Sequence, residues 1–285
     1  MAMMKSVRTE LTRAASRWKT IVVTFIVGVV AVLMLAPYAF MAVSAFKPQG
    51  EIFASPLRFF PRHYTTSSFD LLFKLLPYAR WYLNSFIVAV LGTALTLVIS
   101  SMAGFAFAKY EFRFKSLLFV LVLGTVLVPF QVLLVPQFRI IRALGGFNTY
   151  WALIVPLAAN AFAVFLMRQY TISVPDELLD AARVEGAGEF SLWWRIVLPV
   201  VRPGLAVVGT ITFLAYWNDF FWPLIMTTEP KMFVVNLGIA SLIGPYDNQY
   251  GVLLAGALLA SLPVIIAFLF FQRHIIAGLT AGAVK

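Results

Sequence analysis

Long apolar runs separated by short charged segments are the dominant pattern of this chain. Six of the runs are long enough to cross a hydrocarbon core of about 30 Å as helices that rise about 1.5 Å per residue. These runs cover residues 20–46, 83–108, 116–138, 144–167, 204–226 and 252–271. The pattern therefore predicts an all-α integral membrane protein with six transmembrane helices, built as a single domain over residues 1–285.

The N-terminal segment, residues 1–19, carries five basic residues and one acidic residue ahead of the first apolar run. A secretory signal peptide has an apolar core of only about 7–15 residues. Because the first run of this chain is much longer, we expect it to be retained as a membrane span.

Lysine and arginine are unevenly distributed between the segments that connect the predicted spans. With a cytoplasmic N-terminus, fourteen of the 22 Lys and Arg residues fall in cytoplasmic segments and eight on the opposite side. Cytoplasmic loops are enriched in these residues, so the distribution favours this orientation. The protein is then multi-pass, with both termini and the segment 173–203 in the cytoplasm.

Composition supports the membrane class over nucleic-acid binding. Hydrophobic residues make up 61% of the chain and charged residues only 12%, whereas a soluble domain has about 25% charged residues. The net charge of +10 lies in short loops between apolar runs, so we expect a lipid bilayer and no nucleic acid as partner. The chain has no cysteine, which excludes a disulfide framework.

The segment 173–203 is a long polar stretch between the fourth and fifth predicted spans. Its first part predicts a short helix, because Ser173 is placed to cap it, Pro175 suits its first turn, and Gly186 and Gly188 end it. We expect this helix to expose small residues that another surface can approach closely. The small residues are Ala181, Ala182 and Gly186.

The same segment resembles the "EAA" loop of permease subunits of binding-protein-dependent ATP-binding-cassette importers. Asp180 replaces the usual glutamate and Glu185 a common aspartate, so both charges are kept. In that family the loop forms a coupling helix, between the fourth and fifth spans, that sits in a groove of the cytoplasmic ATPase. The residues that the resemblance assigns to ATPase docking are Asp180, Ala181, Ala182, Glu185, Gly186, Ala187, Ile196, Leu198 and Pro199. From the residues alone, an ordinary amphipathic interfacial helix is the alternative.

Nothing in the sequence predicts catalysis. The chain has no phosphate-cradling G-x-x-x-x-G-K-[ST] motif, and no Gly-Lys pair at all. His63 and His274 are the only histidines and lie in separate loops, so without cysteine a zinc site is not expected. We therefore expect no catalytic residue, metal or cofactor in this chain. The resemblance implies that ATP and magnesium bind a partner ATPase.

The predicted fifth span contains a polar and aromatic cluster around Asp219, the only acid within a predicted span. An acid at the bilayer centre costs about 2.5–3.5 kcal/mol on insertion scales, so such residues usually face protein or water. Amide, carboxylate and ring faces together suit a polyhydroxylated solute. The predicted substrate-path residues are Tyr216, Trp217, Asn218, Asp219 and Phe221.

Two other interpretations of this cluster remain open. In the first, the aromatic residues form only an interfacial belt. In the second, Asp219 is satisfied by a neighbouring helix. The segment 217–224 also resembles the W-N-D/E-F-x-x-P-L stretch of carbohydrate-importer permeases.

The C-terminal segment, residues 272–285, is by itself typical of a frayed tail. It is similar, however, to the R-x-I-x-x-G-L-T-x-G-A-V-K ending of the G-type permease of maltose-class importers. In that class the tail reaches the interface between the two ATPase subunits. The residues that this resemblance assigns to the interface are Gly278, Leu279, Thr280 and Gly282.

Taken together, the resemblances imply a permease subunit of an ATP-driven sugar importer in the plasma (inner) membrane of a prokaryote. The implied partners are a second, non-identical permease subunit, two copies of a cytoplasmic ATPase and an extracytoplasmic sugar-binding protein. The first alternative is an ion-coupled secondary transporter of a small polar solute, which would normally show paired intramembrane charges or an inverted repeat. The second alternative, a non-transporting scaffold, leaves Asp219 unexplained.

Overall fold

The computed structural model describes residues 2–56, 58–243 and 249–281, and all regular elements in these ranges are helices. The predicted all-α class is therefore confirmed. The chain divides into two compact units, Met1–Leu72 with Gln249–Leu258 and Phe73–Asn248 with Leu259–Lys285. The predicted single-domain organisation stays a prediction, and each unit is described by itself.

The first unit contains α1 (Ala2–Ser44), η1 (Gln49–Glu51) and the first residues of α2 (Ser67–Leu75) and α14 (Tyr250–Ala281). The apolar part of α1 exposes most of its side chains, as a lipid-facing or partner-facing helix does. The loop after α1 is organised by Lys47, whose buried ammonium donates to the backbone oxygen of Arg58 at 2.7 Å.

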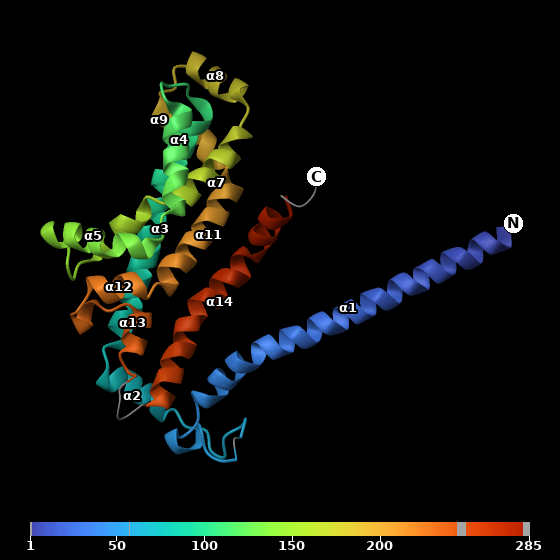
Figure 1. Ribbon diagram of the computed structural model, residues 1–285, viewed down its shortest axis with the longest axis vertical. Coiled ribbons are helices and arrows are strands. Elements are labelled where there is room, and N and C mark those ends of the chain that lie inside the picture. The colour runs from blue at the N-terminus through green and yellow to red at the C-terminus, as the bar shows by residue number, and fades with distance from the viewer. Residues whose placement is uncertain (1, 57, 244–248, 282–285) are drawn as a thin grey trace. The chain divides into compact units, whose positions relative to one another are not determined.

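The second unit is built around its longest helix, α3, which packs along α7 and α11 and also contacts α6 (Figure 1). Figure 1 shows α8 at one end of these helices and α12 and α13 toward the other. The α-helices of six or more residues that lie wholly in this unit are α3 (Tyr78–Lys109), α4 (Lys115–Gly124), α5 (Phe130–Ala143), α6 (Tyr150–Ala158), α7 (Ala161–Ile172), α8 (Asp176–Val184), α11 (Arg202–Asn218), α12 (Phe221–Met226) and α13 (Val235–Ala240).

Small residues on α3 allow this close packing. A Cβ at Gly92 would lie 2.5 Å from the ring of Tyr216, and one at Gly104 would lie 2.8 Å from backbone atoms of Met167 and Arg168. At the opposite end of α3, the buried amide of Asn84 donates to two backbone oxygens of the loop before α13. Small side chains and satisfied polar groups thus hold α3 at the centre of the unit.

Within the described ranges, three single helices are long and apolar enough to cross a membrane: Trp18–Ser44, Tyr78–Lys109 and Tyr250–Phe270. Three further candidates are bent pairs, so the predicted number of six spans is reached only if each pair counts as one span. The bends are 101° between α4 with η2 (Thr125–Leu127) and α5, 50° between α6 and α7, and 83° at the start of α11.

The prediction of one continuous helix over residues 116–138 is therefore wrong. The helix stops before Val128, whose backbone is extended, and α5 starts again after Pro129. Proline has no N–H to donate and disfavours the helical conformation of the residue before it. The predicted continuous helices over 144–167 and 204–226 are likewise interrupted, after Ala158 and after Asn218.

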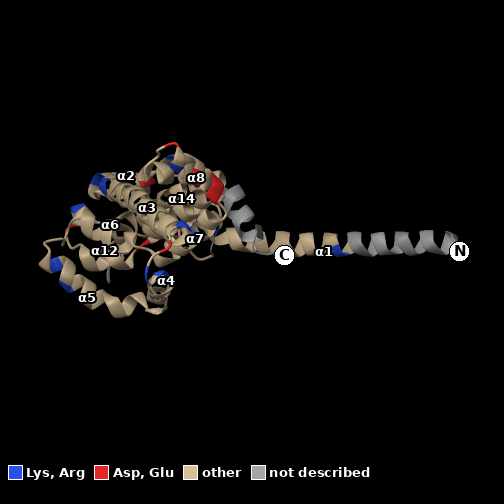
Figure 2. Ribbon diagram, turned by 90° about the horizontal axis from the view of Figure 1, so that it is seen from above, with Lys and Arg blue, Asp and Glu red and all other residues tan. Residues whose placement is uncertain are grey.

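Figure 2 shows that Lys, Arg, Asp and Glu occupy only short stretches of the helices and loops. This distribution fits the charge-poor spans predicted from the sequence. Nothing in the fold fixes which end of the bundle faces the cytoplasm, so the predicted cytoplasmic termini stay a prediction.

We expect Gly104→Ala to destabilise the contact between α3 and α7, because its Cβ meets backbone atoms that have little room to move. Overpacking of this kind costs about 1–3 kcal/mol, so the midpoint of thermal unfolding in detergent should fall. Gly124→Ala is the matched control, since no atom lies within 4 Å of its Cβ. Equal midpoints for the two variants would contradict the close approach.

Candidate coupling loop and transmembrane cavity

The predicted docking helix is present as α8, but Ser173 does not cap it. The first residue outside the helix is Pro175, which makes no side-chain capping bond. The Ser173 hydroxyl instead donates to the backbone oxygen of Tyr170, at 2.7 Å, in the last turn of α7. Asp176 and Glu177 lie in the first turn of α8, where negative charge complements the helix dipole.

Gly186 ends α8, as the sequence predicts. Its φ of +85° lies in the left-handed region that favours glycine. The N–H of Gly186 donates to Arg183 O at 2.9 Å, and the N–H of Ala187 donates to Ala182 O at 2.9 Å. This pair of bonds is the Schellman motif, which satisfies the last carbonyls of a helix.

α8 packs on the core of the second unit through Leu179, which is fully buried, and through Ala182, which is half-buried. The prediction that Ala182 belongs to the exposed face is therefore wrong, because the helix turns this residue toward the core. Ala181 and Gly186 are exposed as predicted, and no atom lies within 4 Å of a Cβ at Gly186. The exposed face of small residues on α8 therefore contains Ala181 and Gly186 but not Ala182.

The segment after α8 runs through α9 (Glu189–Ser191), η3 (Leu192–Val197) and α10 (Leu198–Val200). Its buried anchor is Trp193, whose indole N–H donates to Ser101 Oγ on α3 at 3.3 Å. Of the predicted docking residues after α8, Ala187, Ile196 and Leu198 are half-buried against the core, and Pro199 is exposed. Asp180 and Glu185 are exposed on α8.

Lys109 is the last residue of α3. Its ammonium donates to Ile172 O at 3.4 Å, Val174 O at 2.5 Å and Asp176 Oδ1 at 2.8 Å, and its side chain is only 7% exposed. It therefore ties the end of α3 to the start of the coupling loop. No local signal reveals this bond, because its partners lie more than 60 residues away along the chain.

A second polar cluster closes the other end of α8. Arg183 pairs with Asp180 at 2.9 Å and with Glu189 at 3.1 Å, and the Tyr110 hydroxyl bonds to Glu189. The bond from Arg183 lowers the pKa of the Glu189 carboxyl. Burial, followed by the bond to Glu189, raises the pKa of Tyr110 to about 12. At neutral pH the cluster therefore holds a carboxylate acceptor and a phenol donor.

The aromatic residues of the predicted substrate path point in different directions. Tyr216 is buried and donates from its hydroxyl to Ile154 O on α6 at 2.8 Å. Trp217 is buried as well, and its indole N–H donates to Ala260 O on α14 at 3.0 Å. Asn218 is exposed and donates to Leu214 O at 2.9 Å, while Phe221 is exposed on α12. The five predicted path residues therefore do not form one surface.

Asp219 occupies the break between α11 and α12. Its Oδ1 accepts from the backbone N–H groups of Phe221 at 3.1 Å and Trp222 at 3.3 Å. The carboxylate thus caps the start of α12. A neighbouring helix therefore does satisfy Asp219, and this helix is α12, which follows it directly in the chain.

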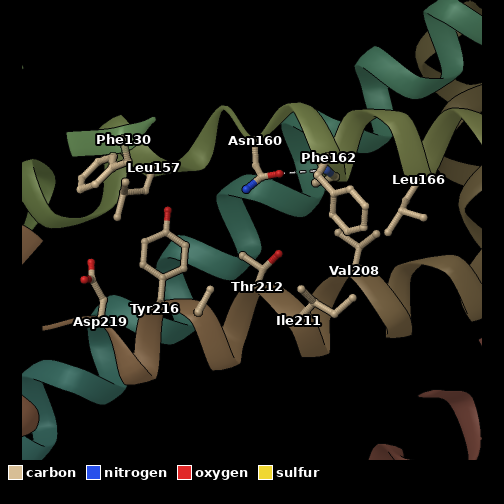
Figure 3. Close-up of a pocket in the computed structure, with 12 residues that line it drawn as sticks. Phe130, Leu157, Asn160, Phe162, Leu166, Val208, Ile211, Thr212, Tyr216 and Asp219 are labelled. Carbon is tan, nitrogen blue, oxygen red and sulfur yellow. Dashed lines mark hydrogen bonds between the residues drawn. The ribbon is translucent and has the colours of Figure 1, made fainter. Parts of the chain in front are cut away.

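A cavity of about 280 Å³ lies between α11 and the broken pair of α6 and α7 (Figure 3). Tyr216 and Asp219 line it, whereas Trp217, Asn218 and Phe221 are not among its lining residues. Two other polar residues that line the cavity, Thr212 and Asn160, were not predicted from the sequence. Figure 3 shows Thr212 and Tyr216 together on α11, with Asn160 at the start of α7. The spacing of residues 212, 216 and 219 matches one helical face.

The C-terminal segment is helical as far as it is described, because α14 continues to Ala281. The backbone of Gly278, Leu279 and Thr280 therefore belongs to a helix, and Gly282 lies outside the described residues. The predicted role of the tail at an ATPase interface stays a prediction.

The family model for the inner membrane component of binding-protein-dependent transport systems matches residues 96–280. The chain belongs to this family. The matched range includes the segment 173–203 and the residues that line the cavity described above. The predicted permease function, with no catalytic role of its own, is thereby confirmed, and an ion-coupled transporter or a scaffold is inconsistent with it.

Curated permeases are similar to this family member over most of their length. The arabinooligosaccharides transport system permease protein AraQ of Halalkalibacterium halodurans is 38% identical over 259 residues, which is 90% of this chain and 93% of that protein. The lactose transport system permease protein LacG of Rhizobium radiobacter is 31% identical over 280 residues, covering 96% and 100%. The sn-glycerol-3-phosphate transport system permease protein UgpE of Yersinia pestis is 31% identical over 265 residues, covering 90% and 94%.

A solved structure supports the permease fold. A chain of a bacterial ABC transporter involved in the import of the acidic polysaccharide alginate superposes with a TM-score of 0.83 at 20% identity. The match covers 91% of this permease and 97% of that chain.

We expect Asp219→Asn to keep the stability of the permease and Asp219→Leu to lower it. An asparagine Oδ1 still accepts the two N–H groups that start α12, whereas leucine leaves both without this acceptor. A lost cap costs about 0.5–2 kcal/mol. Thermal unfolding of the purified subunit measures the difference, with Asn218→Leu as the exposed neighbouring control. If Asn and Leu at position 219 destabilise equally, the charge and not the cap is required.

Proposed function

We propose that this chain is a permease subunit of an ATP-driven importer of sugars or closely related polyhydroxylated solutes. The named relatives belong to transport systems for arabinooligosaccharides, lactose and sn-glycerol-3-phosphate, and each of the three solutes carries at least two hydroxyl groups. The coupling to ATP is proposed from the structure of α8. This helix is closed at its C-terminus by the Schellman motif, exposes small residues, and lies at one end of the bundle.

The proposed assembly contains a second, non-identical permease subunit, two copies of a cytoplasmic ATPase that bind ATP and magnesium, and an extracytoplasmic sugar-binding protein. Dependence on a binding protein is part of the family description. The assembly lies in the inner membrane of a prokaryote, with both termini of this chain in the cytoplasm, as the Lys and Arg distribution favours.

The proposed docking face consists of those exposed members of the predicted set that lie on α8 or directly after it. Ala181 and Gly186 provide close approach, while Asp180 and Glu185 provide charge beside them. The half-buried members (Ala182, Ala187, Ile196 and Leu198) pack against the core and fix the loop to the spans. In this arrangement, ATP-driven closure of the ATPase displaces α8, and the spans follow as a packed unit.

The proposed solute path passes the cavity between α6, α7 and α11. Its polar groups from Asn160, Thr212, Tyr216 and Asp219 lie among apolar and aromatic side chains. Such a surface offers hydrogen-bonding groups to hydroxyls and ring faces to the CH groups of a sugar. Asn218 and Phe221, exposed nearby, are secondary candidates, and Trp217 acts in packing against α14.

We expect Ala181→Trp to reduce uptake strongly, because the indole would separate α8 from the ATPase surface. The measurement is uptake of labelled sugar by proteoliposomes that contain the complete importer, together with the amount of ATPase that co-purifies. Ala181→Ser is the control, since it changes the same exposed position without bulk. Normal uptake in Ala181→Trp would refute docking through this face. Gly186→Trp is a poorer test, because any side chain there is strained at φ +85°.

If the solute path passes this cavity, we expect the cysteine of Ala215→Cys to react with a small water-soluble thiol reagent. Bound sugar or trapped nucleotide should change the rate of this reaction. Ala215 lines the cavity, whereas Leu214, the next residue, does not. Leu214→Cys is therefore the matched control and should react at a rate that does not depend on solute. The chain has no native cysteine to compete. Identical, solute-independent labelling of both variants would move the path elsewhere.

The C-terminal tail is proposed to contact the ATPase through Gly278, Leu279, Thr280 and Gly282. Deletion of residues 279–285 removes no predicted span, so we expect the membrane level to stay normal while sugar-stimulated ATP hydrolysis changes. ATPase assays on the reconstituted importer check this expectation. Unchanged hydrolysis and uptake would leave the tail without a role in coupling.

A further inference from the structure

α8 is held at both ends by two consecutive residues from another helix. Chain connectivity joins α8 to α7 on one side and to α11 on the other, but it does not join α8 to α3. The bonds between them come from Lys109, the last residue of α3, and from Tyr110, the residue that ends it. We call these two residues the α3 clamp.

The bond at the start of α8 is the stronger part of the α3 clamp. The Lys109 ammonium has three oxygen partners, and two of them, Val174 O and Asp176 Oδ1, lie within 2.8 Å. The Lys109 side chain is only 7% exposed, so the ammonium is largely shielded from water, whereas the side chain of Asp176 is 74% exposed. Hydrogen bonds from a charged donor are about twice as strong as neutral ones. Displacing the start of α8 without α3 would strip a buried ammonium of its partners.

The bond at the far end of α8 passes through Glu189. The Tyr110 hydroxyl bonds to this carboxylate, which Arg183 on α8 also holds, at 3.1 Å. The Tyr110 ring is itself fixed to α3, because it packs edge-on against Phe105 with ring centroids 5.1 Å apart. The last two residues of this connection, Arg183 and Glu189, are more exposed than Lys109, so we expect this end to contribute less.

We propose that Lys109 and Tyr110 are positioning residues that transmit displacement of α8 to α3. This inference rests on the proposed docking of α8 to an ATPase. α3 packs along both α7 and α11, so a clamp that moves α3 with α8 makes the three helices move together. Without the clamp, α8 is linked to α3 only through the segment that follows it, where Trp193 bonds to Ser101, and through core packing.

The test uses the complete importer in proteoliposomes and measures solute transported per ATP hydrolysed. Lys109→Met keeps the length of the side chain and removes the ammonium, and we expect the ratio to fall roughly tenfold, which corresponds to about 1.4 kcal/mol of coupling. Tyr110→Phe removes one hydroxyl and keeps the ring, so a smaller fall is expected. Lys115→Met is the matched control, because Lys115 pairs with Glu111 one turn earlier in the same loop region.

The ratio separates coupling from simple stability. A purely structural Lys109 lowers the amount of assembled complex and leaves transport per ATP unchanged in the complexes that remain, and that outcome would overturn the proposal. A fall of the same size in Lys115→Met would also overturn it, because the effect would then follow from any lost charge in this loop.

A chemical bridge provides the rescue experiment. The Lys109→Cys/Asp176→Cys double variant removes the bond, and a short bifunctional thiol reagent restores a link between α3 and α8 in a subunit with no native cysteine. We expect the ratio to recover after bridging is confirmed by mass spectrometry; confirmed bridging without recovery contradicts the clamp. Ala181→Trp tests docking independently. If it abolishes uptake while Lys109→Met keeps the ratio, only the clamp fails, and if it leaves uptake normal, the proposed docking fails.

Discussion

The second unit depends on satisfying backbone polar groups wherever a helix is interrupted inside an apolar bundle. In hydrocarbon an unpaired N–H or C=O costs several kcal/mol, so irregular backbone persists only where protein or a water-lined cavity supplies partners. Asn160 accepts from Ala163 N at 2.9 Å and starts α7, while Asp219 accepts two N–H groups and starts α12. The same two side chains line the cavity. The breaks and the cavity are therefore one feature of the fold.

Much of the fold was predictable because apolar run length and glycine position act locally. The helical class and the end of α8 at Gly186 follow from such local signals. The bends do not, because proline has no fixed outcome in this chain. Pro129 precedes the start of α5 at a sharp bend, whereas Pro136 and Pro156 lie inside helices. Which proline breaks a helix depends on whether the surrounding structure satisfies the freed carbonyl, and the sequence window does not contain that information.

The candidate site shows the same division between local and distant information. The sequence predicts Asp219 as an acid within a span, but its acceptor role depends on the break between α11 and α12, which apolar periodicity does not encode. Trp217 was grouped with Tyr216 by adjacency, although neighbouring positions on a helix point about 100° apart. The bonds of Lys109 and Tyr110 join segments separated by more than 60 residues, so no single-sequence pattern connects them.

The Schellman motif and the ion pairs around Arg183 also affect the conformational entropy that α8 loses when a partner binds it. A loop that must order itself on binding loses conformational entropy, with about 0.5–1.5 kcal/mol for each immobilised flexible side chain. In α8 the terminal carbonyls are already bonded, and the Arg183 side chain is already held by Asp180 and Glu189. The helix is thus preorganised, and most of that entropic cost has been met during folding. A partner protein gains its binding free energy from α8 with little loss to ordering, and it can release the helix without unravelling it.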